Sequence, residues 1–368
     1  MVNIVHQPIL ADIESRHGVP AGAITTTLDT LDRPLRDLRL SVIDQCNFRC
    51  TYCMPRETFG ADYRFLPSSE RLSFEQMLKL AKAFALLGVE KIRITGGEPL
   101  LRRGLESLIE QLAKLTTASG KPLELALTTN GSLLAAKARS LRDAGLGRVT
   151  VSLDAVDDAI FRRMSDVDMP VSRILDGIEA ARAVGLDPVK VNAVIERGVN
   201  DSQILPLVRR FKGTGVAVRF IEFMDVGGAG GWSNTKVITA RETREIVESA
   251  FPLVPVVVRE QTGTAVNYRH ADGTGEVGFI ASVSQPFCGS CSRARVSADG
   301  QLYSCLFATH GTDLRPWLTE AASVEQLAGV VRSRWIQRAD RYSELRSTPR
   351  RPGSGKTYPT VRMSLVGG

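Results

Sequence analysis

Six cysteines in this chain form two groups of three, and thiols are good ligands for soft metals. The first group has C-x3-C-x2-C spacing and consists of Cys46, Cys50 and Cys53. The second has C-x2-C-x13-C spacing and consists of Cys288, Cys291 and Cys305. Thiolate ligands favour iron–sulfur clusters or zinc. Because a structural cluster or zinc site usually takes four protein ligands, three thiolates leave one metal position open for a substrate or cofactor.

Zinc is the alternative metal for both groups. Cys50 and Cys53 have the spacing of half a zinc site. His310, which lies beyond Cys305 in the sequence, would complete a Cys3His site with the second group. Such a zinc ion would be structural, whereas an iron–sulfur cluster with an open iron would bind substrate there. The cysteine spacing alone leaves both alternatives open.

The composition is typical of a soluble globular protein, with 368 residues of which 43% are hydrophobic. No stretch approaches the roughly 20 apolar residues of a membrane span. The N-terminal residues lack the basic and apolar regions of a secretory signal, so we expect a cytoplasmic protein, in which cysteines hold metal more often than they form disulfides. The net charge of +7 is concentrated in a C-terminal tail rich in Pro, Gly and Ser, and such a tail is more often solvated than a binding site.

Six short segments rich in Val, Ile, Leu and Thr predict strands, at residues 38–44, 91–97, 123–130, 148–154, 188–196 and 217–225. Helical patterns separate them. The pattern near 73–87 begins with Ser73 and Gln76 in capping-box spacing and is followed by Gly88, typical of a helix end. Six alternations of strand and helix predict an α/β fold with a parallel sheet. Because a closed barrel has eight units, we expect a partial (β/α)6 TIM-type barrel, although a flat doubly wound sheet fits the same periodicity.

The alternation of strands and helices stops after Asp225, which predicts a division of the chain in that region. We expect four parts: a partly mobile leader over 1–36, the barrel over 37–235, a C-terminal α+β segment carrying the second cysteine group over 236–345, and a basic tail over 346–368. Within the third part we expect short antiparallel strands over 253–306 and a last helix near 323–338.

The first cysteine group follows the first predicted strand, and "GGEP" at 96–99 ends the second. This combination resembles the radical S-adenosylmethionine superfamily. The resemblance implies a [4Fe–4S] cluster on the three cysteines, with S-adenosyl-L-methionine on the open iron and its one-electron cleavage to a 5′-deoxyadenosyl radical. The residues themselves agree, because Gly96 and Gly97 allow close backbone approach to a ligand and Tyr52, between two cysteines, can pack on adenine.

With both cysteine groups, the sequence from about Leu38 to the C-terminus resembles the GTP 3′,8-cyclases, the molybdenum-cofactor biosynthesis protein A family. The resemblance implies two [4Fe–4S] clusters and conversion of GTP to (8S)-3′,8-cyclo-7,8-dihydroguanosine 5′-triphosphate, the first step of molybdenum cofactor (molybdopterin) biosynthesis. It further implies a homodimer, an electron donor such as flavodoxin or ferredoxin, and a cyclic pyranopterin monophosphate synthase that acts next. We expect no membrane and no nucleic acid as partners.

The same resemblance implies ligand contacts residue by residue. Those to S-adenosyl-L-methionine are Tyr52, Gly97, Ser152 and Met224. Those to GTP are Arg39, Lys91, Arg93, Thr128, Lys190, Arg219, Arg293, Ala294 and Arg295. Gly367 and Gly368 match a terminal double glycine that enters the active site; without the resemblance, two glycines would simply end a mobile tail.

Basic residues inside the hydrophobic strands support the GTP assignment independently. Arg39, Arg93, Lys190 and Arg219 belong to four different predicted strands. Unpaired buried charge is costly, but side chains that converge from parallel strands would supply the several cations a triphosphate needs. Two other functions stay open: a radical enzyme that modifies a peptide, and a zinc-stabilised nucleic-acid-binding protein, whose binding would fall steeply with salt.

Overall fold

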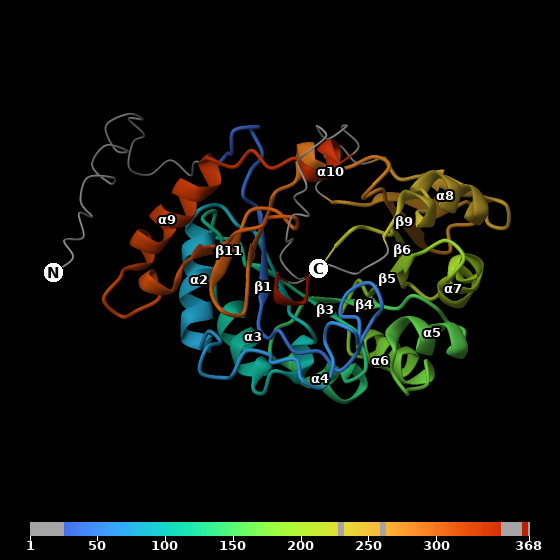
Figure 1. Cartoon of the computed structure of the whole chain (residues 1–368), viewed down its shortest axis with the longest axis horizontal. Coiled ribbons are helices and arrows are strands. Elements are labelled where there is room, and N and C mark those ends of the chain that lie inside the picture. The colour runs from blue at the N-terminus through green and yellow to red at the C-terminus, as the bar shows by residue number, and fades with distance from the viewer. Residues whose placement is uncertain (1–25, 227–231, 258–262, 347–362, 367–368) are drawn as a thin grey trace.

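Twelve strands form one sheet in the order β12-β11-β10-β1-β2-β3-β4-β5-β6-β9-β8-β7. Figure 1 shows how the helices are arranged around the strands. The computed structural model describes residues 26–226, 232–257, 263–346 and 363–366. The strands are β1 (Asp37–Ser41), β2 (Lys91–Thr95), β3 (Glu124–Thr129), β4 (Arg148–Ser152), β5 (Lys190–Ile195), β6 (Ala217–Glu222), β7 (Leu253–Pro255), β8 (Val266–His270), β9 (Glu276–Ile280), β10 (Arg293–Val296), β11 (Gln301–Tyr303) and β12 (Thr312–Asp313). Within these residues β12 and β7 end the sheet without pairing to each other, so it is unclosed.

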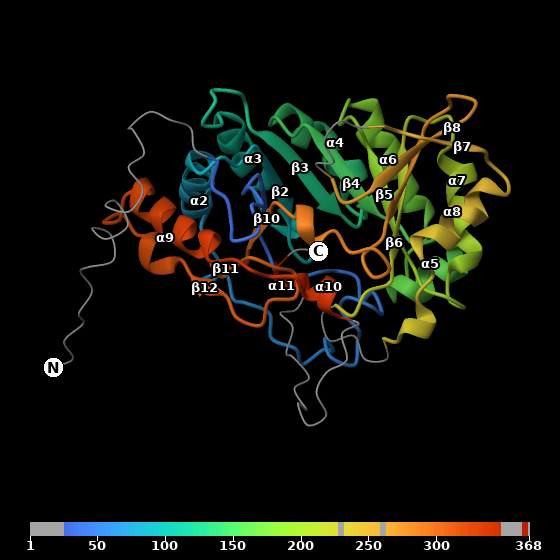
Figure 2. The ribbon, with the colours of Figure 1, turned by 90° about the horizontal axis from the view of Figure 1, so that it is seen from above.

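The six predicted strands are β1 to β6, and every neighbouring pair among them is parallel. The helices that connect these strands lie along the outer face of the curved sheet (Figure 2). In chain order the helices are α2 (Phe74–Leu86), α3 (Leu105–Ala113), α4 (Leu134–Asp143), α5 (Asp158–Ser165), α6 (Ser172–Ala183), α7 (Ile204–Phe211), α8 (Ala240–Glu248), α9 (Val324–Ile336), α10 (Tyr342–Leu345) and α11 (Met363–Val366). The predicted partial (β/α)6 barrel is therefore confirmed.

Local sequence signals explain where several helices begin and end. Ser73 and Gln76 form the predicted capping box at the start of α2, and Thr239 and Glu242 form another before α8. Gly88 follows α2 with φ +99°, a left-handed conformation that glycine adopts without steric cost. Among the described residues, no helix is both long enough and apolar enough to cross a bilayer.

The C-terminal segment extends the barrel sheet at both of its edges. As predicted, its strands β7, β8 and β9 pair antiparallel with one another, and so do β10, β11 and β12. However, β9 pairs parallel with β6, and β10 pairs parallel with β1. The chain between β9 and β10 therefore passes from one edge of the barrel to the other, and it carries Cys288 and Cys291.

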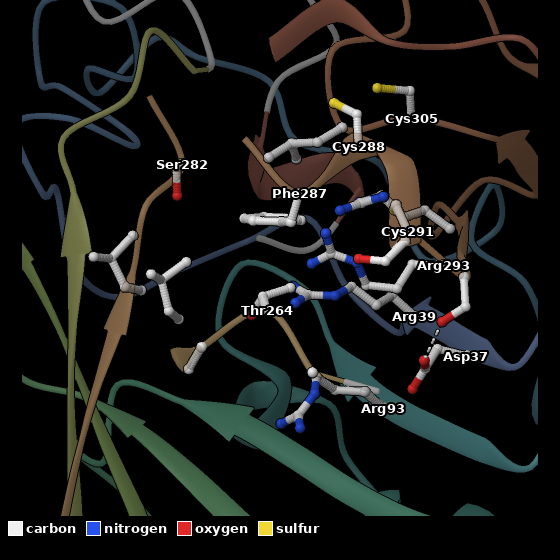
Figure 3. Close-up of a pocket in the computed structure, with 18 of the residues that line it drawn as sticks. Asp37, Arg39, Arg93, Thr264, Ser282, Phe287, Cys288, Cys291, Arg293 and Cys305 are labelled. Carbon is white, nitrogen blue, oxygen red and sulfur yellow. Dashed lines mark hydrogen bonds between the residues drawn. The ribbon is translucent and has the colours of Figure 1, made fainter. Parts of the chain in front are cut away.

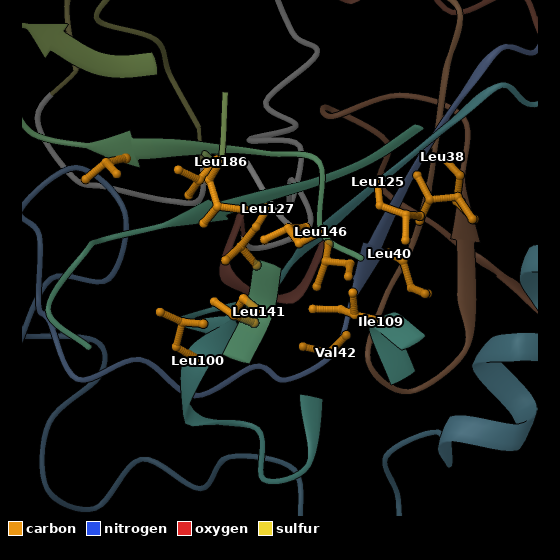
Figure 4. Close-up of a cluster of buried hydrophobic side chains, with 14 of the residues drawn as sticks. Leu38, Leu40, Val42, Leu100, Ile109, Leu125, Leu127, Leu141, Leu146 and Leu186 are labelled. Atoms are coloured by element: carbon orange, nitrogen blue, oxygen red, sulfur yellow. The ribbon is translucent and has the colours of Figure 1, made fainter. Parts of the chain in front are cut away.

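The strands alternate between a hydrophobic outer face and a polar inner face. In β1, Leu38 and Leu40 are fully buried in the core that the helices cover, together with Ile109 and Leu127 (Figure 4). Arg39, between the two leucines, points to the opposite face because successive side chains of a strand alternate. Burying the leucines therefore fixes which residues face the barrel interior.

Candidate functional site

The first cysteine group lies on the loop that follows β1. The Phe48 amide donates to Cys46 Sγ at 3.4 Å, and the Asn130 side-chain amide approaches the same sulfur at 3.8 Å. Burial, followed by the charge of Glu98, raises the pKa of Cys46 to about 11. Burial and the other two thiols raise the pKa of Cys50 well above its usual range, and burial, Cys46 and Asp154 raise that of Cys53 to about 12. Three crowded, buried thiols of this kind ionise only beside positive charge, which fits the irons of a cluster.

The "GGEP" turn packs directly against the segment that leads into Cys46. A Cβ atom on Gly97 would lie 2.2 Å from the Gln45 carbonyl oxygen, and the Gly97 amide donates to the Ile43 carbonyl at 2.7 Å. These glycines were predicted to allow a ligand to approach the backbone. In the structure they admit the protein's own backbone, and so fix the start of the cysteine loop.

Glu98 connects this turn to the turn after β3. Its side chain accepts hydrogen bonds from the Leu100 amide, the Thr129 hydroxyl and the Asn130 amide at 2.7 to 2.9 Å. Burial raises the pKa of Glu98 to about 7, against the lowering effect of these donors. No role was predicted for Glu98, although it belongs to the "GGEP" motif, or for Asn130, the last residue of the third predicted strand.

The residues expected to bind S-adenosyl-L-methionine lie in two places. Tyr52 is in the cysteine loop, and its hydroxyl donates to Asp154 Oδ2 at 2.8 Å. Ser152 is the last residue of β4, two residues before Asp154. Met224 instead lines a large cavity on the inner side of the barrel. The structure thus ties Tyr52 to the β4 end, and the contacts of all these residues with the cofactor remain predictions.

A cavity of about 370 Å³ is enclosed by the barrel strands and the chain between β9 and β10 (Figure 3). The predicted GTP residues that line it are Arg39, Lys91, Arg93, Thr128, Lys190, Arg219, Arg293 and Arg295. Ala294 does not line it, because its side chain is fully buried in the core on the other face of β10. Any contact of Ala294 with a ligand would have to come from its backbone.

Strand register sorts the charges in the cavity into two rows. In one row Arg293, Asp37, Lys91 and Glu124 stand side by side on β10, β1, β2 and β3. Charges of opposite sign alternate there, and Lys91 Nζ lies 2.9 Å from Asp37 Oδ1. This pairing partly neutralises Lys91.

The next row contains arginines without an acid among them. Arg295, Arg39 and Arg93 are in register on β10, β1 and β2, and Arg148 follows on β4 beyond Ala126. Arg148 has an ion-pair partner, Glu124, in the first row. All four arginines line the cavity. Figure 3 shows Arg39 and Arg93 of this row, and Arg293 of the first row, reaching in from separate strands.

The pKa values reflect this excess of positive charge. Burial and then repulsion from neighbouring arginines lower the pKa of Arg93 and of Arg295 to about 10. Burial and then Arg219, Arg148 and Arg93 lower the pKa of Lys190 to about 7. Each cation is held at an electrostatic cost that an anion with several charges would relieve.

The second cysteine group lines the same cavity. Figure 3 shows the Cys288 and Cys305 thiols on the side of the cavity away from Arg93. Burial raises the pKa of Cys291, but Arg293, Arg338 and Arg295 outweigh it and lower that pKa to about 6. These cations would stabilise thiolate ligands, so the donor set fits a bound metal cluster. Within the described residues no three Cys, His, Asp or Glu side chains are already drawn together as a metal site, and His310 is exposed.

Comparisons with known proteins agree with this arrangement. A family model described as "Radical SAM superfamily" matches residues 40–211, and one described as "Molybdenum Cofactor Synthesis C" matches 216–344. A "GTP 3′,8-cyclase" of Xanthomonas axonopodis pv. citri (strain 306) is 53% identical over 341 residues, which cover 92% of this chain and 98% of that protein. The chain belongs to the GTP 3′,8-cyclase family. The predicted resemblance is confirmed.

A second relative, from another organism, also matches most of the chain. The "GTP 3′,8-cyclase" of Acidothermus cellulolyticus (strain ATCC 43068 / DSM 8971 / 11B) is 50% identical over 323 residues, covering 87% of this chain and 88% of that protein. Among solved structures, Streptococcus suis SuiB bound to S-adenosylmethionine superposes with a TM-score of 0.57 at 16% identity, covering 82% of this chain and 68% of that one. This last similarity shows a shared fold.

Several cavity residues of this GTP 3′,8-cyclase family member were not expected from its sequence. Thr128 was expected, but Thr150 beside it also accepts from Arg93 Nη1 at 3.2 Å. Phe287 lies under the Arg293 guanidinium at 4.9 Å, next to the cysteine loop. Arg148 could have been found from the alternation of "RVTVS", which places it on the same face as Thr150. Phe287 gave no such signal, because it lies outside any strand.

Proposed function

We propose that this chain is a GTP 3′,8-cyclase that binds GTP in the cavity between β1 to β6 and the second cysteine group. It would form (8S)-3′,8-cyclo-7,8-dihydroguanosine 5′-triphosphate, the first step of molybdenum cofactor biosynthesis. The observation that carries the proposal is the row of Arg295, Arg39 and Arg93, which faces the cavity beside three free cysteines. Several converging cations of this kind favour a polyanionic ligand such as a triphosphate.

The charge distribution suggests how GTP lies. Arg93, Lys190 and Arg219 belong to the barrel strands β2, β5 and β6, and the triphosphate would lie against them. The guanine would lie at the side of the second cysteine group, near Arg293 and Phe287. Phosphate charge would then lie beside cations whose pKa values are lowered by burial and by neighbouring cations, which favours the complex.

The two cysteine groups would hold two [4Fe–4S] clusters, the first with S-adenosyl-L-methionine. When bound, this cofactor pair supplies a carbon-centred radical by one-electron cleavage of the sulfonium. The chain's own contribution is positioning: Gly97 and Glu98 fix the first loop, and Asp154 fixes Tyr52 through its hydroxyl. By binding the triphosphate, the cations would position the ribose of GTP so that its C3′ hydrogen is the one that the radical removes.

We further propose the partners that the family resemblance implied. The chain would form a homodimer, receive electrons from a low-potential donor such as flavodoxin or ferredoxin, and pass its product to a cyclic pyranopterin monophosphate synthase. We propose cytoplasmic action without membrane or nucleic-acid partners. Outside the C-terminal tail the formal charges nearly balance, so the rest of the chain has little excess of positive charge for a nucleic-acid backbone.

One anaerobic experiment tests the proposal. Iron and sulfide per chain are measured after reconstitution, and the reduced protein is then incubated with S-adenosyl-L-methionine and GTP. We expect about eight irons per chain, because each cysteine group would hold one four-iron cluster, and 5′-deoxyadenosine formation that depends on GTP. ATP serves as the matched control, because it has the same triphosphate. Four irons would indicate zinc at the second group, and 5′-deoxyadenosine formation indifferent to GTP would contradict the cyclase assignment.

A further inference from the structure

Three charged side chains from the two ends of the described chain form a buried network beside the second cysteine group. Asp29 and Arg33 both precede β1, four residues apart. Arg338 comes just after α9. Their side chains are 0%, 1% and 2% exposed. Asp29 Oδ2 lies 2.7 Å from Arg33 Nε and 3.1 Å from Arg338 Nη1, so one carboxylate joins both guanidinium groups.

Both arginines donate hydrogen bonds to the backbone of the cysteine loop. Arg33 Nη1 donates to the Cys288 carbonyl at 2.8 Å. Arg338 Nη1 donates to the Cys291 carbonyl at 2.7 Å. Two planar guanidinium groups, both paired with the Asp29 carboxylate, thus hold the backbone at the two cysteines of the C-x2-C pair. The spacing between the backbone positions of these cysteines is thereby set by the network.

Neighbouring contacts hold the network itself in place. The Asp29 side chain also accepts from the Leu31 and Arg33 amides at 2.9 and 3.0 Å. The Trp335 ring of α9 lies 4.5 Å from the Arg338 guanidinium, and its indole NH donates to the Arg33 carbonyl at 3.2 Å. The arginines therefore have little freedom to follow a cysteine loop that moves.

Stability alone is a poor explanation for such a network. Burying ions costs as much as their attraction returns, and packed apolar side chains often stabilise a core equally well. Here Arg338 Nε has only a 3.8 Å ion pair with Asp340 Oδ2, and Arg33 Nη2 and Arg338 Nε are buried without a hydrogen-bond partner. What apolar residues could not supply is a pair of donors aimed at two carbonyls of the cysteine loop.

We propose that Asp29, Arg33 and Arg338 are positioning residues of the second metal site. They act through the backbone of Cys288 and Cys291, and hold the loop in a conformation that receives the cluster. The inference rests on the proposed second [4Fe–4S] cluster. It also makes the segment before β1 a part of that site, since Asp29 and Arg33 lie outside the barrel strands.

The test uses the full-length chain with Cys46, Cys50 and Cys53 all changed to Ala, so that only the second group binds iron. Arg338→Lys keeps the charge, but the shorter side chain does not reach the position from which Arg338 Nη1 donates to both the Cys291 carbonyl and Asp29. Loss of such an outer contact typically weakens metal retention about 10- to 100-fold. After anaerobic reconstitution, we expect iron loss to a chelator to be faster by about that factor, with a changed electron paramagnetic resonance signal of the reduced cluster.

Lys79→Met is the matched control. Lys79 Nζ donates to the Thr319 and Ala322 carbonyls just before α9, so its loss loosens the attachment of α9 without touching the cysteine loop. Its rate of iron loss should equal that of the parent even if its unfolding midpoint falls as much as that of Arg338→Lys. Asp29→Asn is the second variant, because an amide keeps the side-chain shape while removing the shared charge.

The outcomes separate the inference from the function on which it rests. If the parent protein, in which only Cys46, Cys50 and Cys53 are changed, binds no iron, the proposed second cluster is contradicted. A parent with about four irons, together with Arg338→Lys and Asp29→Asn variants that release iron at the parent rate, would overturn the positioning role alone. If both variants fail to fold in their metal-free form, as judged by circular dichroism, the network is a folding element and the inference is likewise overturned.

Discussion

Replacing Arg219 by methionine should stabilise the GTP-free protein against unfolding and, at the same time, weaken its binding of GTP. Arg219 lies on β6, in register with Gly278 of β9, and its Nε is buried without a hydrogen-bond partner. A Cβ atom on Gly278 would lie 3.1 Å from Arg219 Cγ, so the glycine leaves room for the arginine stem. Methionine keeps much of that apolar stem and removes the charge.

The size of each effect follows from the electrostatics of the cavity. Burial, and then Arg148, lower the Arg219 pKa from 12.5 to about 10. At pH 7 the side chain is still charged, so holding it costs up to about 3 kcal/mol at 1.36 kcal/mol per pKa unit. We therefore expect the free energy of unfolding to rise by about 1 to 3 kcal/mol in the variant. A lost hydrogen bond to a charged phosphate, worth about 1.5 to 3 kcal/mol, should raise the Kd for GTP about 10- to 150-fold.

Two measurements on cluster-reconstituted protein check this pair of effects. Denaturant unfolding without GTP gives the stability, and anaerobic calorimetry gives the Kd for GTP. Arg209→Met, at an exposed position on α7, is the matched control and should change neither quantity by more than about 0.5 kcal/mol. An Arg219→Met variant that is less stable and binds GTP with unchanged affinity would refute the reasoning, because Arg219 would then be a structural residue.

Three further predictions concern pH, the first cysteine loop and the C-terminal glycines. Burial and neighbouring cations lower the Lys190 pKa from 10.5 to about 7. Between these two pH values the unfolded chain keeps the Lys190 proton and the folded protein loses it, so the GTP-free protein should gain stability as pH rises from about 7 to 10.5. GTP should reverse the effect by raising that pKa, so calorimetry in buffers of different ionisation enthalpy should show proton uptake at pH 8 that is absent in Lys190→Met. Gly97→Ala should lower the iron bound by the first cysteine group, because the added Cβ would collide with the Gln45 carbonyl. Gly198→Ala is the control and should keep its iron, because Gly198 has φ +73° and no atom lies within 4 Å of an added Cβ. Equal iron content in the two variants would contradict the role of Gly97. Deleting Gly367–Gly368, which lie outside the described residues, should abolish cyclisation and leave both clusters bound; retained product formation would disprove it.

Local patterns in the sequence were sufficient for the barrel. The six strands, the capping box at Ser73 and the glycine after α2 were all predicted and all observed, because each depends on neighbours within a few residues. The same is true of Arg39 and Arg93, since alternation along a strand places them opposite buried leucines and isoleucines. Arg148 follows the same rule on β4 and was overlooked.

Other parts of the site depend on pairings that no local pattern encodes. Strand β10 joins β1 in parallel although more than 250 residues separate them in the chain, and this pairing brings Arg295 beside Arg39. The prediction of antiparallel strands over 253–306 was correct for the hairpins and did not include these parallel pairings. Ala294 illustrates the limit, because its side chain faces the core and not the cavity.

By itself, the sequence determined the chemistry that is available: two sets of three thiols, cations inside apolar strands, and a partial barrel that carries them. Only the tertiary structure decided which charges meet. It gave Lys91 a carboxylate partner in Asp37, left the arginine row of Arg295, Arg39 and Arg93 without an acid, and closed a buried network from Asp29 to Arg338. The physical reason is that charge interactions act through space, so their sign and strength follow from strand register and burial and not from separation along the chain.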